Sequence, residues 1–203
     1  MGKQDRDARS ISDSGHVAKL IQLGSDPESI AEAQATAAKA LRTVGVVYPH
    51  NACAATLSSF LIGAGISVPM TLGAGNLAAR LKNNRGWDTV KVGQQMAGDV
   101  GVCQDNTPPA GADHIYLVVE VDDDDDDDKM VIADNQAQGT THVRYASGKG
   151  GKTPTAYFLR ASDDAPGVTF REPMQERRRK DVVVGDEDTN ALPELFMDDG
   201  TPR

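Results

Sequence analysis

The feature that most constrains the fold is a change of residue pattern near residue 98. Before this point the chain is rich in Ala and Leu at helical spacing. After it the chain breaks into short β-rich runs separated by Gly, Pro, Asn or Asp. The expected strands cover residues 98–103, 114–121, 129–134, 141–146 and 155–161. Helices followed by consecutive short strands predict an α+β fold with a mainly antiparallel sheet.

Three helices are expected before the change of pattern. Asp26 can cap the first, which has a proline in its first turn and ends near Gly45. The second carries Cys53 near its start, with Asn51 as the expected N-cap, and its apolar residues at i, i+4, i+7, i+8 and i+11 predict one buried face. The segment GNLAARLKNNRGW predicts a third, shorter helix.

The two ends of the chain are polar and charged. We expect residues 1–25 to be a flexible N-terminal segment, residues 26–162 to be one domain, and residues 163–203 to be a flexible charged tail. A run of seven Asp residues, 122–128, lies between two expected strands, where mutual repulsion favours a solvated hairpin tip. The run lacks the Gly and the spaced ligands of a calcium loop. We therefore expect no metal site there.

Charge and hydropathy exclude several classes of protein. The net charge of −9 argues against a nucleic-acid partner. No apolar run approaches the roughly 20 residues of a membrane span, and the N-terminus lacks the apolar stretch of a signal peptide. The two cysteines do not form the disulfide framework of a small secreted domain. We expect synthesis in the cytoplasm as a soluble protein, with export or injection by a route that needs no cleaved signal left open.

Cys53 allows two interpretations, a buried structural thiol or a nucleophile. A thiol at a helix start lies among unpaired backbone N–H groups and at the positive end of the helix dipole, and both favour the thiolate. The same N–H groups can stabilise an oxyanion during acyl transfer. A nucleophilic interpretation requires a base elsewhere in the chain. Cys103, at the end of an expected strand, is interpreted as a small apolar residue.

His114 is the best candidate for the base, because it opens the most apolar expected strand after a loop rich in Pro and Gly. His142 is expected to face solvent, on the same side of its strand as Arg144. A third residue should orient the imidazole by accepting its other N–H. Asn135 and Asp134 both follow the next strand, and Asn135 is preferred over Asp134.

These motifs occur in an order that resembles the NlpC-like and CHAP superfamily of papain-fold hydrolases, over about residues 30–160. The matching segments are CAATLSSFLIGAGI, AGDVGV, ADHIYLVVEV and VIADNQ. The resemblance implies a papain-like fold in which Cys53 opens a helix, Gly98-Asp99 begins the first core strand and His114 opens the second. It implies Asn135 or Asp134 as the third catalytic residue, with no metal or cofactor required. Taken alone, Gly98-Asp99 is interpreted as a tight turn into a strand.

Members of this superfamily cleave bacterial cell-wall peptides, which makes peptidoglycan peptides the implied substrate. Ala52 stands where many NlpC-like members carry Asp, and Ala54 and Ala55 stand where they carry Ser-Gly. The segment is more similar to the CHAP branch and to the amidases that type VI secretion systems inject. Tyr48 and Asn51, just before the thiol, are candidates for contacting the substrate or the oxyanion.

The prediction is therefore a cysteine hydrolase of peptide or amide bonds in peptidoglycan stem peptides. An alternative keeps the fold and acts as a deamidating or transglutaminase-like toxin on protein glutamine. A third is a non-catalytic interaction module in which Cys53 is merely buried. An immunity protein would be an expected partner of a delivered toxin.

Overall fold

Helices precede strands along the chain, as the sequence pattern predicts. The computed structural model describes residues 12–105, 111–121 and 128–162, which all fall within one unit, Met1–Phe170. The helices are α1 (Val17–Ser25), α2 (Pro27–Arg42), α3 (Cys53–Ala64) and α4 (Ala74–Ala79), with single turns η1 (Asp13–His16) and η2 (Arg80–Asn84). The strands are β1 (Asp88–Val90), β2 (Val100–Asp105), β3 (Gly111–Val121), β4 (Lys129–Ala133), β5 (His142–Tyr145) and β6 (Thr155–Arg160). The predicted α+β class is confirmed.

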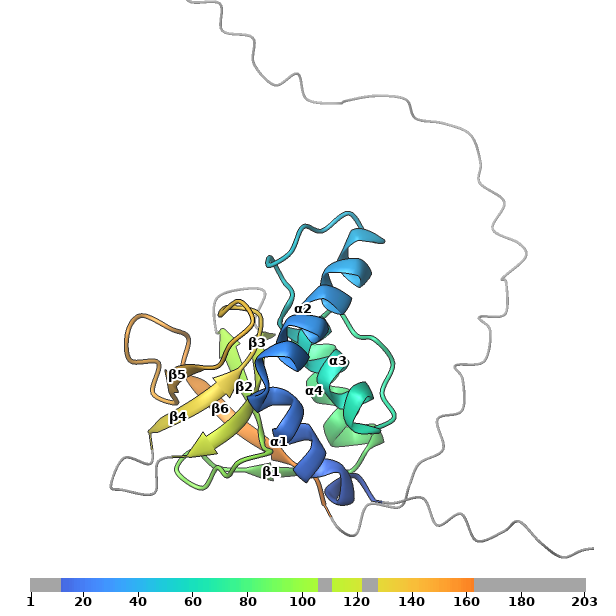
Figure 1. The fold of residues 1–203 in the computed structure, drawn as a ribbon. Helices are drawn as coiled ribbons and strands as arrows, with labels where there is room; N and C mark the ends of the chain where they lie inside the picture. Colours follow the sequence, from blue (N-terminus) through green and yellow to red (C-terminus); the bar gives the residue numbers. More distant parts are fainter. Residues whose placement is uncertain (1–11, 106–110, 122–127, 163–203) are drawn as a thin grey trace, which may run out of the picture. The chain divides into compact units, whose positions relative to one another are not determined.

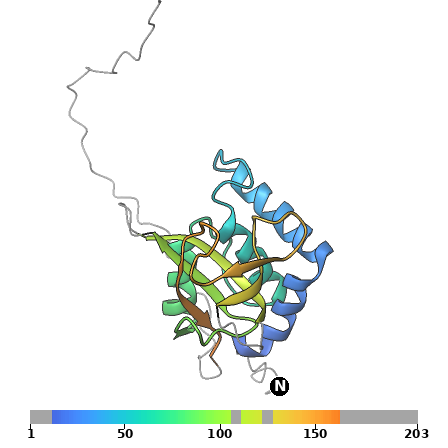
Figure 2. The same cartoon turned by 90° about the vertical axis from the view of Figure 1, so that its left-hand side faces the viewer.

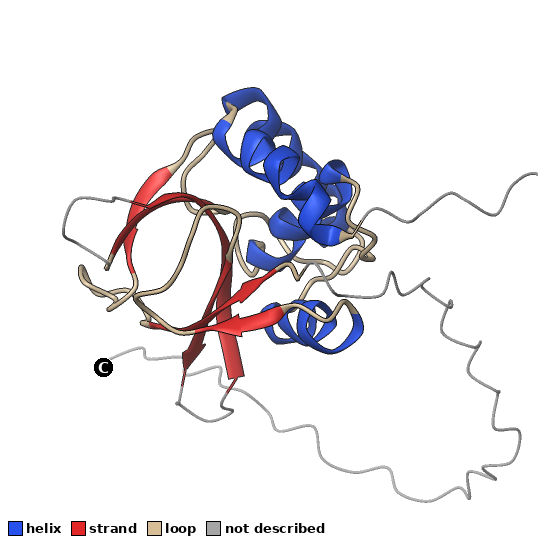
Figure 3. Ribbon diagram, turned by 90° about the horizontal axis from the view of Figure 1, so that it is seen from below, coloured by secondary structure: helices blue, strands red, loops and turns tan. Residues whose placement is uncertain are grey.

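All six of these strands belong to one antiparallel sheet, in the order β1-β6-β2-β3-β4-β5. The helices lie together on one side of this sheet (Figure 1). Figure 2 shows the strands from the other side, in front of the helices. The sheet curls strongly, with the helices outside the curl (Figure 3).

Because the sheet curls, both of its faces are buried. The larger apolar cluster fills the space between helices and sheet and includes Leu57, Phe60 and Leu117. A second cluster lies on the opposite face and consists of Cys103, Tyr116, Val118, Met130, Ile132, Ala146 and Phe158. Gly101 on β2 makes room for this second cluster, since a Cβ at that position would overlap the Tyr116 ring.

The helix that carries Cys53 differs from its prediction in two ways. The structure buries nine of the twelve residues of α3, so the helix is buried nearly all round instead of on one face. Its N-cap is Ala52, and Asn51 lies before the helix with a positive φ of 51°. The predicted N-cap role of Asn51 is therefore wrong. Gly65 ends the helix with a φ of 97°, a conformation that favours glycine.

The N-terminal part of the chain is more ordered than predicted. Residues 13–25, placed by the sequence in a flexible segment, form η1 and α1. Asp13 is buried, pairs with Arg85 and accepts a hydrogen bond of 2.9 Å from Trp87 Nε1. This contact connects η1 to the chain that follows α4. Residues 1–11 and the predicted tail, 163–203, lie outside the described residues.

Two local predictions from turn residues agree with the structure. Asp26 caps α2 by accepting a hydrogen bond of 2.8 Å from the Ser29 N–H. Gly98 has a φ of 92° and forms a turn, and β2 begins after this turn at Val100. The run at 122–127 lies outside the described residues, but it joins β3 to its antiparallel neighbour β4.

Candidate active site

Cys53 is the first residue of α3 and has 6% exposure. The N-cap residue Ala52 has no side-chain oxygen that could accept from the first backbone N–H groups. The first turn of a helix leaves N–H groups without intrahelical acceptors, and the helix dipole is positive there. The sulfur therefore lies at a point where negative charge is stabilised.

His114 is brought to this point by β3. It is paired with Cys103 of β2 next to an irregularity in the register, and it is 8% exposed. Its Nε2 lies 2.9 Å from Oδ2 of Asp134, and it also forms a hydrogen bond with Cys53. Since Nε2 is engaged by the carboxylate, Nδ1 is the nitrogen left for the thiol.

The protonated form of His114 is strongly favoured. Burial of the ring opposes its charge, but the hydrogen bonds to Asp134 and Cys53, together with the negative charges of both, outweigh burial and raise the pKa of His114 to about 9. The ring therefore carries a positive charge beside the sulfur at neutral pH.

Asp134 follows β4 and is buried. Three N–H donors reach its carboxylate: Nε2 of His114 to Oδ2 at 2.9 Å, Nε2 of His142 to Oδ1 at 3.0 Å, and the Gln136 backbone N–H to Oδ1 at 2.6 Å. Burial alone would raise the pKa of Asp134, but the hydrogen bonds and charges of the two imidazoles lower it well below its ordinary value. Asp134 is thus an ionised carboxylate between two histidines.

The preference for Asn135 as the residue that orients His114 is not supported by this geometry. The Asn135 side chain points elsewhere, and its Nδ2 donates to the Pro49 carbonyl oxygen at 2.8 Å. Its backbone carbonyl accepts from the Tyr48 hydroxyl at 3.3 Å. Asn135 thus connects the loop after β4 to the loop before Cys53. The alternative, Asp134, is the residue in contact with the imidazole.

The structure places the two candidate substrate contacts in different surroundings. Tyr48 is half-buried beside the loop after β4, and burial raises the pKa of its phenol. Asn51 is exposed two residues before the thiol. Their contact with a substrate or an oxyanion stays a prediction.

His142 was expected to face solvent, and this expectation is wrong. The prediction that His142 and Arg144 share one face of the strand is correct. That face is not exposed, because the Arg144 side chain is buried in the curl of the sheet. His142 instead contacts Asp134, with a quarter of its side chain exposed. Sequence reasoning therefore missed a residue next to the predicted site. The available signal was that His142 and Arg144, two residues apart, share one face of their strand.

The second thiol lies in different surroundings. Cys103 is fully buried in the second cluster and accepts a hydrogen bond of 3.0 Å from Nη2 of Arg144. Burial raises its pKa, although the Arg144 charge opposes this. Cys103 is the cross-strand partner of His114, and the Tyr116 ring, which belongs to the same cluster as Cys103, stacks on His114 with a centroid distance of 5.9 Å. The interpretation of Cys103 as a structural residue fits this position.

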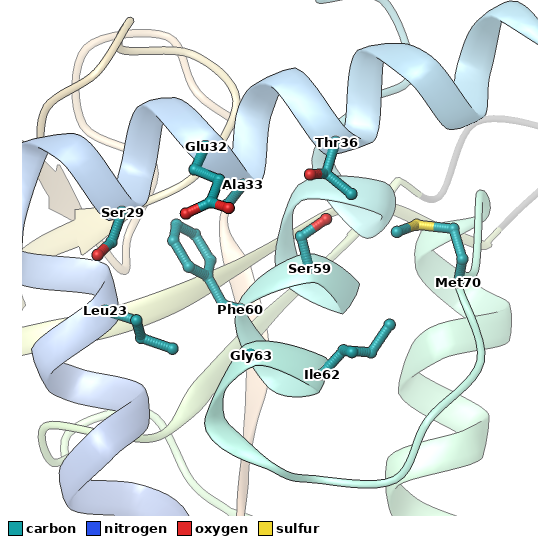
Figure 4. A pocket seen from close by; sticks show the side chains of 10 residues that line it. All are labelled: Leu23, Ser29, Glu32, Ala33, Thr36, Ser59, Phe60, Ile62, Gly63 and Met70. Carbon is teal, nitrogen blue, oxygen red and sulfur yellow. The ribbon is translucent and has the colours of Figure 1, made fainter.

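Two hollows lie near the helices. One, of about 470 Å³, is lined by Tyr48, Pro49 and Asn135 and by the alanine-rich face of α2, close to the loops that carry the site. The other, of about 250 Å³, lies among α1, α2 and α3 and is lined by Leu23, Phe60 and Ile62 (Figure 4). Cys53, His114 and Asp134 do not line this second hollow, so nothing connects it to their chemistry.

Within residues 12–105, 111–121 and 128–162, no group of three His, Cys, Asp or Glu side chains could hold a metal ion. None of the helices in these ranges is long and apolar enough to cross a bilayer.

Comparisons with known proteins yield little. No protein-family model matches the chain, and no curated protein matches it. Among solved structures, the crystal structure of Ly7917 aligns with a TM-score of 0.40 at 17% identity. The alignment covers 71% of this chain and 62% of that one, which is less than two thirds of the Ly7917 chain. A similarity at this level identifies no family.

Proposed function

We propose that the protein is a cysteine hydrolase of peptide or amide bonds, with Cys53 as nucleophile, His114 as acid and base, and Asp134 as the residue that orients the imidazole. The observation that carries the proposal is the chain of contacts from Cys53 through His114 to Asp134. A protonated imidazole next to a thiol at a helix start is an arrangement that stabilises a thiolate nucleophile.

The chemistry follows from the positions of these groups. The Cys53 thiolate attacks the substrate carbonyl carbon, and the developing oxyanion is stabilised by backbone N–H groups in the first turn of α3. The C–N bond breaks as the His114 imidazolium gives its proton to the leaving amine. Water then attacks the thioester, His114 takes up a proton from it, and the carboxylate product leaves Cys53.

The substrate class rests on the ordered motifs that resemble cell-wall hydrolases. The positions that match this motif order are Cys53, Gly98-Asp99 and His114, with Asp134 as the third residue. Peptidoglycan stem peptides are therefore the substrate to test first.

Replacement of each cysteine in turn tests the proposal. Purified peptidoglycan is incubated with wild type, Cys53→Ala and Cys103→Ala, and the released fragments are quantified. Cys53→Ala should reduce the rate on the order of a thousandfold or more, because no other group supplies the nucleophile. Cys103→Ala is the matched control and should keep its activity, since Cys103 lies in the second cluster.

Three results would contradict different parts of the proposal. Equal loss in both folded variants would count against Cys53 as nucleophile. Ammonia release from protein glutamine without release of wall fragments would favour a deamidase. Slow alkylation of Cys53 by iodoacetamide at neutral pH, together with inactivity on both substrates, would favour a non-catalytic module.

A further inference from the structure

We infer that His142 is a positioning residue of this site: its imidazole holds the Asp134 carboxylate in the orientation in which that carboxylate binds His114. The inference rests on the proposed cysteine hydrolase, in which Asp134 orients His114. His142 would hold Asp134 in place.

Strand pairing brings the two groups together. His142 is the first residue of β5 and is paired with Ile132 of β4. Asp134 lies two residues beyond Ile132, so the alternation of side chains places it on the same face of the sheet as Ile132 and His142. The separation of 3.0 Å between His142 Nε2 and Asp134 Oδ1 is thus fixed by the sheet.

The two carboxylate oxygens have separate tasks. Oδ2 accepts from His114, whereas Oδ1 accepts from His142 and from the Gln136 backbone N–H. Gln136 is only two residues from Asp134, so it moves with the same loop. His142 is the donor to Oδ1 that comes from another strand, and it therefore connects the carboxylate to the sheet.

The carboxylate also needs this donor because of its burial. The Asp134 side chain has 0% exposure, and a buried charge is costly unless donors surround it. An ionised carboxylate only accepts hydrogen bonds, so His142 must carry its proton on Nε2. His142 acts through Asp134, and its removal should alter the alignment of His114 without altering substrate contacts.

A pair of substitutions separates the donor from the ring. In His142→Gln the side-chain amide can place an N–H close to the position of Nε2, whereas His142→Leu fills similar space without a donor. Two rates are measured: alkylation of Cys53 by iodoacetamide, and hydrolysis of purified peptidoglycan. We expect His142→Leu to lower the alkylation rate and kcat by about tenfold or more with KM nearly unchanged, and His142→Gln to lie within about threefold of wild type.

A double-mutant cycle tests whether His142 acts through Asp134. In an Asp134→Ala background, His142→Leu should change the alkylation rate by less than about twofold, because the group that it positions is already absent. The exposed neighbour Val143 provides a control variant on the same strand, Val143→Thr, which should leave both rates near wild type.

Three outcomes would overturn the inference. These are an equal loss from His142→Leu in both backgrounds, equal loss from His142→Gln and His142→Leu, or a His142→Leu variant within about twofold of wild type. If His142→Leu does not fold, His142→Gln is compared with His142→Asn, whose amide is one carbon too short, and equal rates would overturn it. The alkylation cycle needs no substrate. Absence of wall hydrolysis with an intact cycle would therefore reject the proposed substrate and leave the role of His142 standing.

Discussion

Replacement of Asp134 by asparagine exchanges one carboxylate oxygen for an NH₂ group and removes the negative charge. Its effect can be derived from three contacts. The donors are His114 Nε2, His142 Nε2 and the Gln136 backbone N–H, and all of them are directed at the two carboxylate oxygens. An amide offers one oxygen and one NH₂ group. At least one of the three donors must therefore face the NH₂ group in Asp134→Asn.

The two donors on Oδ1 decide which partner loses its acceptor. If the amide oxygen serves His142 and Gln136, the NH₂ group faces His114. Nε2 of His114 must then become an acceptor, which moves the ring proton to Nδ1, the nitrogen left for Cys53. A ring with its proton on that side cannot accept the thiol proton. The same exchange in the serine-protease triad lowers kcat by about 10⁴, and we expect about 10³ to 10⁴ here.

The charge state of His114 should change as well. The Asp134 charge and hydrogen bond contribute to a pKa of about 9, while burial pushes in the opposite direction. With pKa 9 about nine tenths of the rings are protonated at pH 8, and with the ordinary pKa of 6.5 the fraction is about 3%. Alkylation of Cys53 at pH 8, to the extent that it depends on the imidazolium, should then fall by about thirtyfold.

Titration of the His114 ring by ¹⁵N NMR between pH 5 and 10, together with iodoacetamide rates, measures both effects. The matched control is Asn135→Ala, which removes the contact to Pro49 but leaves the three donors in place. We expect this control to lose less than about tenfold in kcat. A His114 pKa still near 9 in Asp134→Asn would refute the reasoning, as would an equal loss of activity in Asn135→Ala.

Two further predictions concern stability. The pKa of His114 is about 9 in the folded protein, against an ordinary value of 6.5. Its protonation therefore contributes about 3 kcal/mol to the free energy of unfolding. This contribution is fully present below pH 6.5, decreases as the pH rises and is lost above pH 9. Urea denaturation at pH 6 and pH 9.5 should show this loss in wild type and not in His114→Gln. Asp13→Ala removes the acceptor of Trp87 Nε1 and the carboxylate that pairs with Arg85, and should lower the free energy of unfolding by about 3 kcal/mol. Thermal denaturation measures this, and Asp88→Ala, at an exposed position, should cost less than about 0.5 kcal/mol.

Elements whose signals are local could be predicted from the sequence. The predicted start of α2 agrees with the structure because Asp26 and the proline after it act within one turn. The helix α1 was missed because tertiary contacts stabilise it: Leu20 is fully buried, and Gly24 lies against Leu117 of β3. Strand β1 has three residues and depends on its pairing with β6. Neither contact leaves a local pattern.

The choice between Asp134 and Asn135 depended on strand register, which the sequence does not determine here. Consecutive residues of a strand point to opposite faces, so a shift of one residue exchanges the two candidates. In the structure Leu117 is paired with Ala133, which places Asp134 on the face of Tyr116 and His114. A two-residue hairpin turn would have fixed this register, but seven Asp residues connect β3 to β4. The register is set by long-range packing instead.

The curl of the sheet explains why His142 was placed in solvent and why it lies at the site. Alternation correctly grouped His142 with Arg144, and such polar residues normally mark an exposed face. Here that face turns inward over the second cluster, so Arg144 is 3% exposed and His142 is directed toward Asp134. The same inward face carries His114 on β3. Strands β3 and β5 therefore supply His114 and His142, and Asp134 follows directly after β4, the strand between them. The three residues form a single line of hydrogen bonds that ends at the first residue of α3. A flatter sheet with the same register would move β5 away from β3 and separate these groups, so the site depends on the curl of the sheet as well as on the residues that form it.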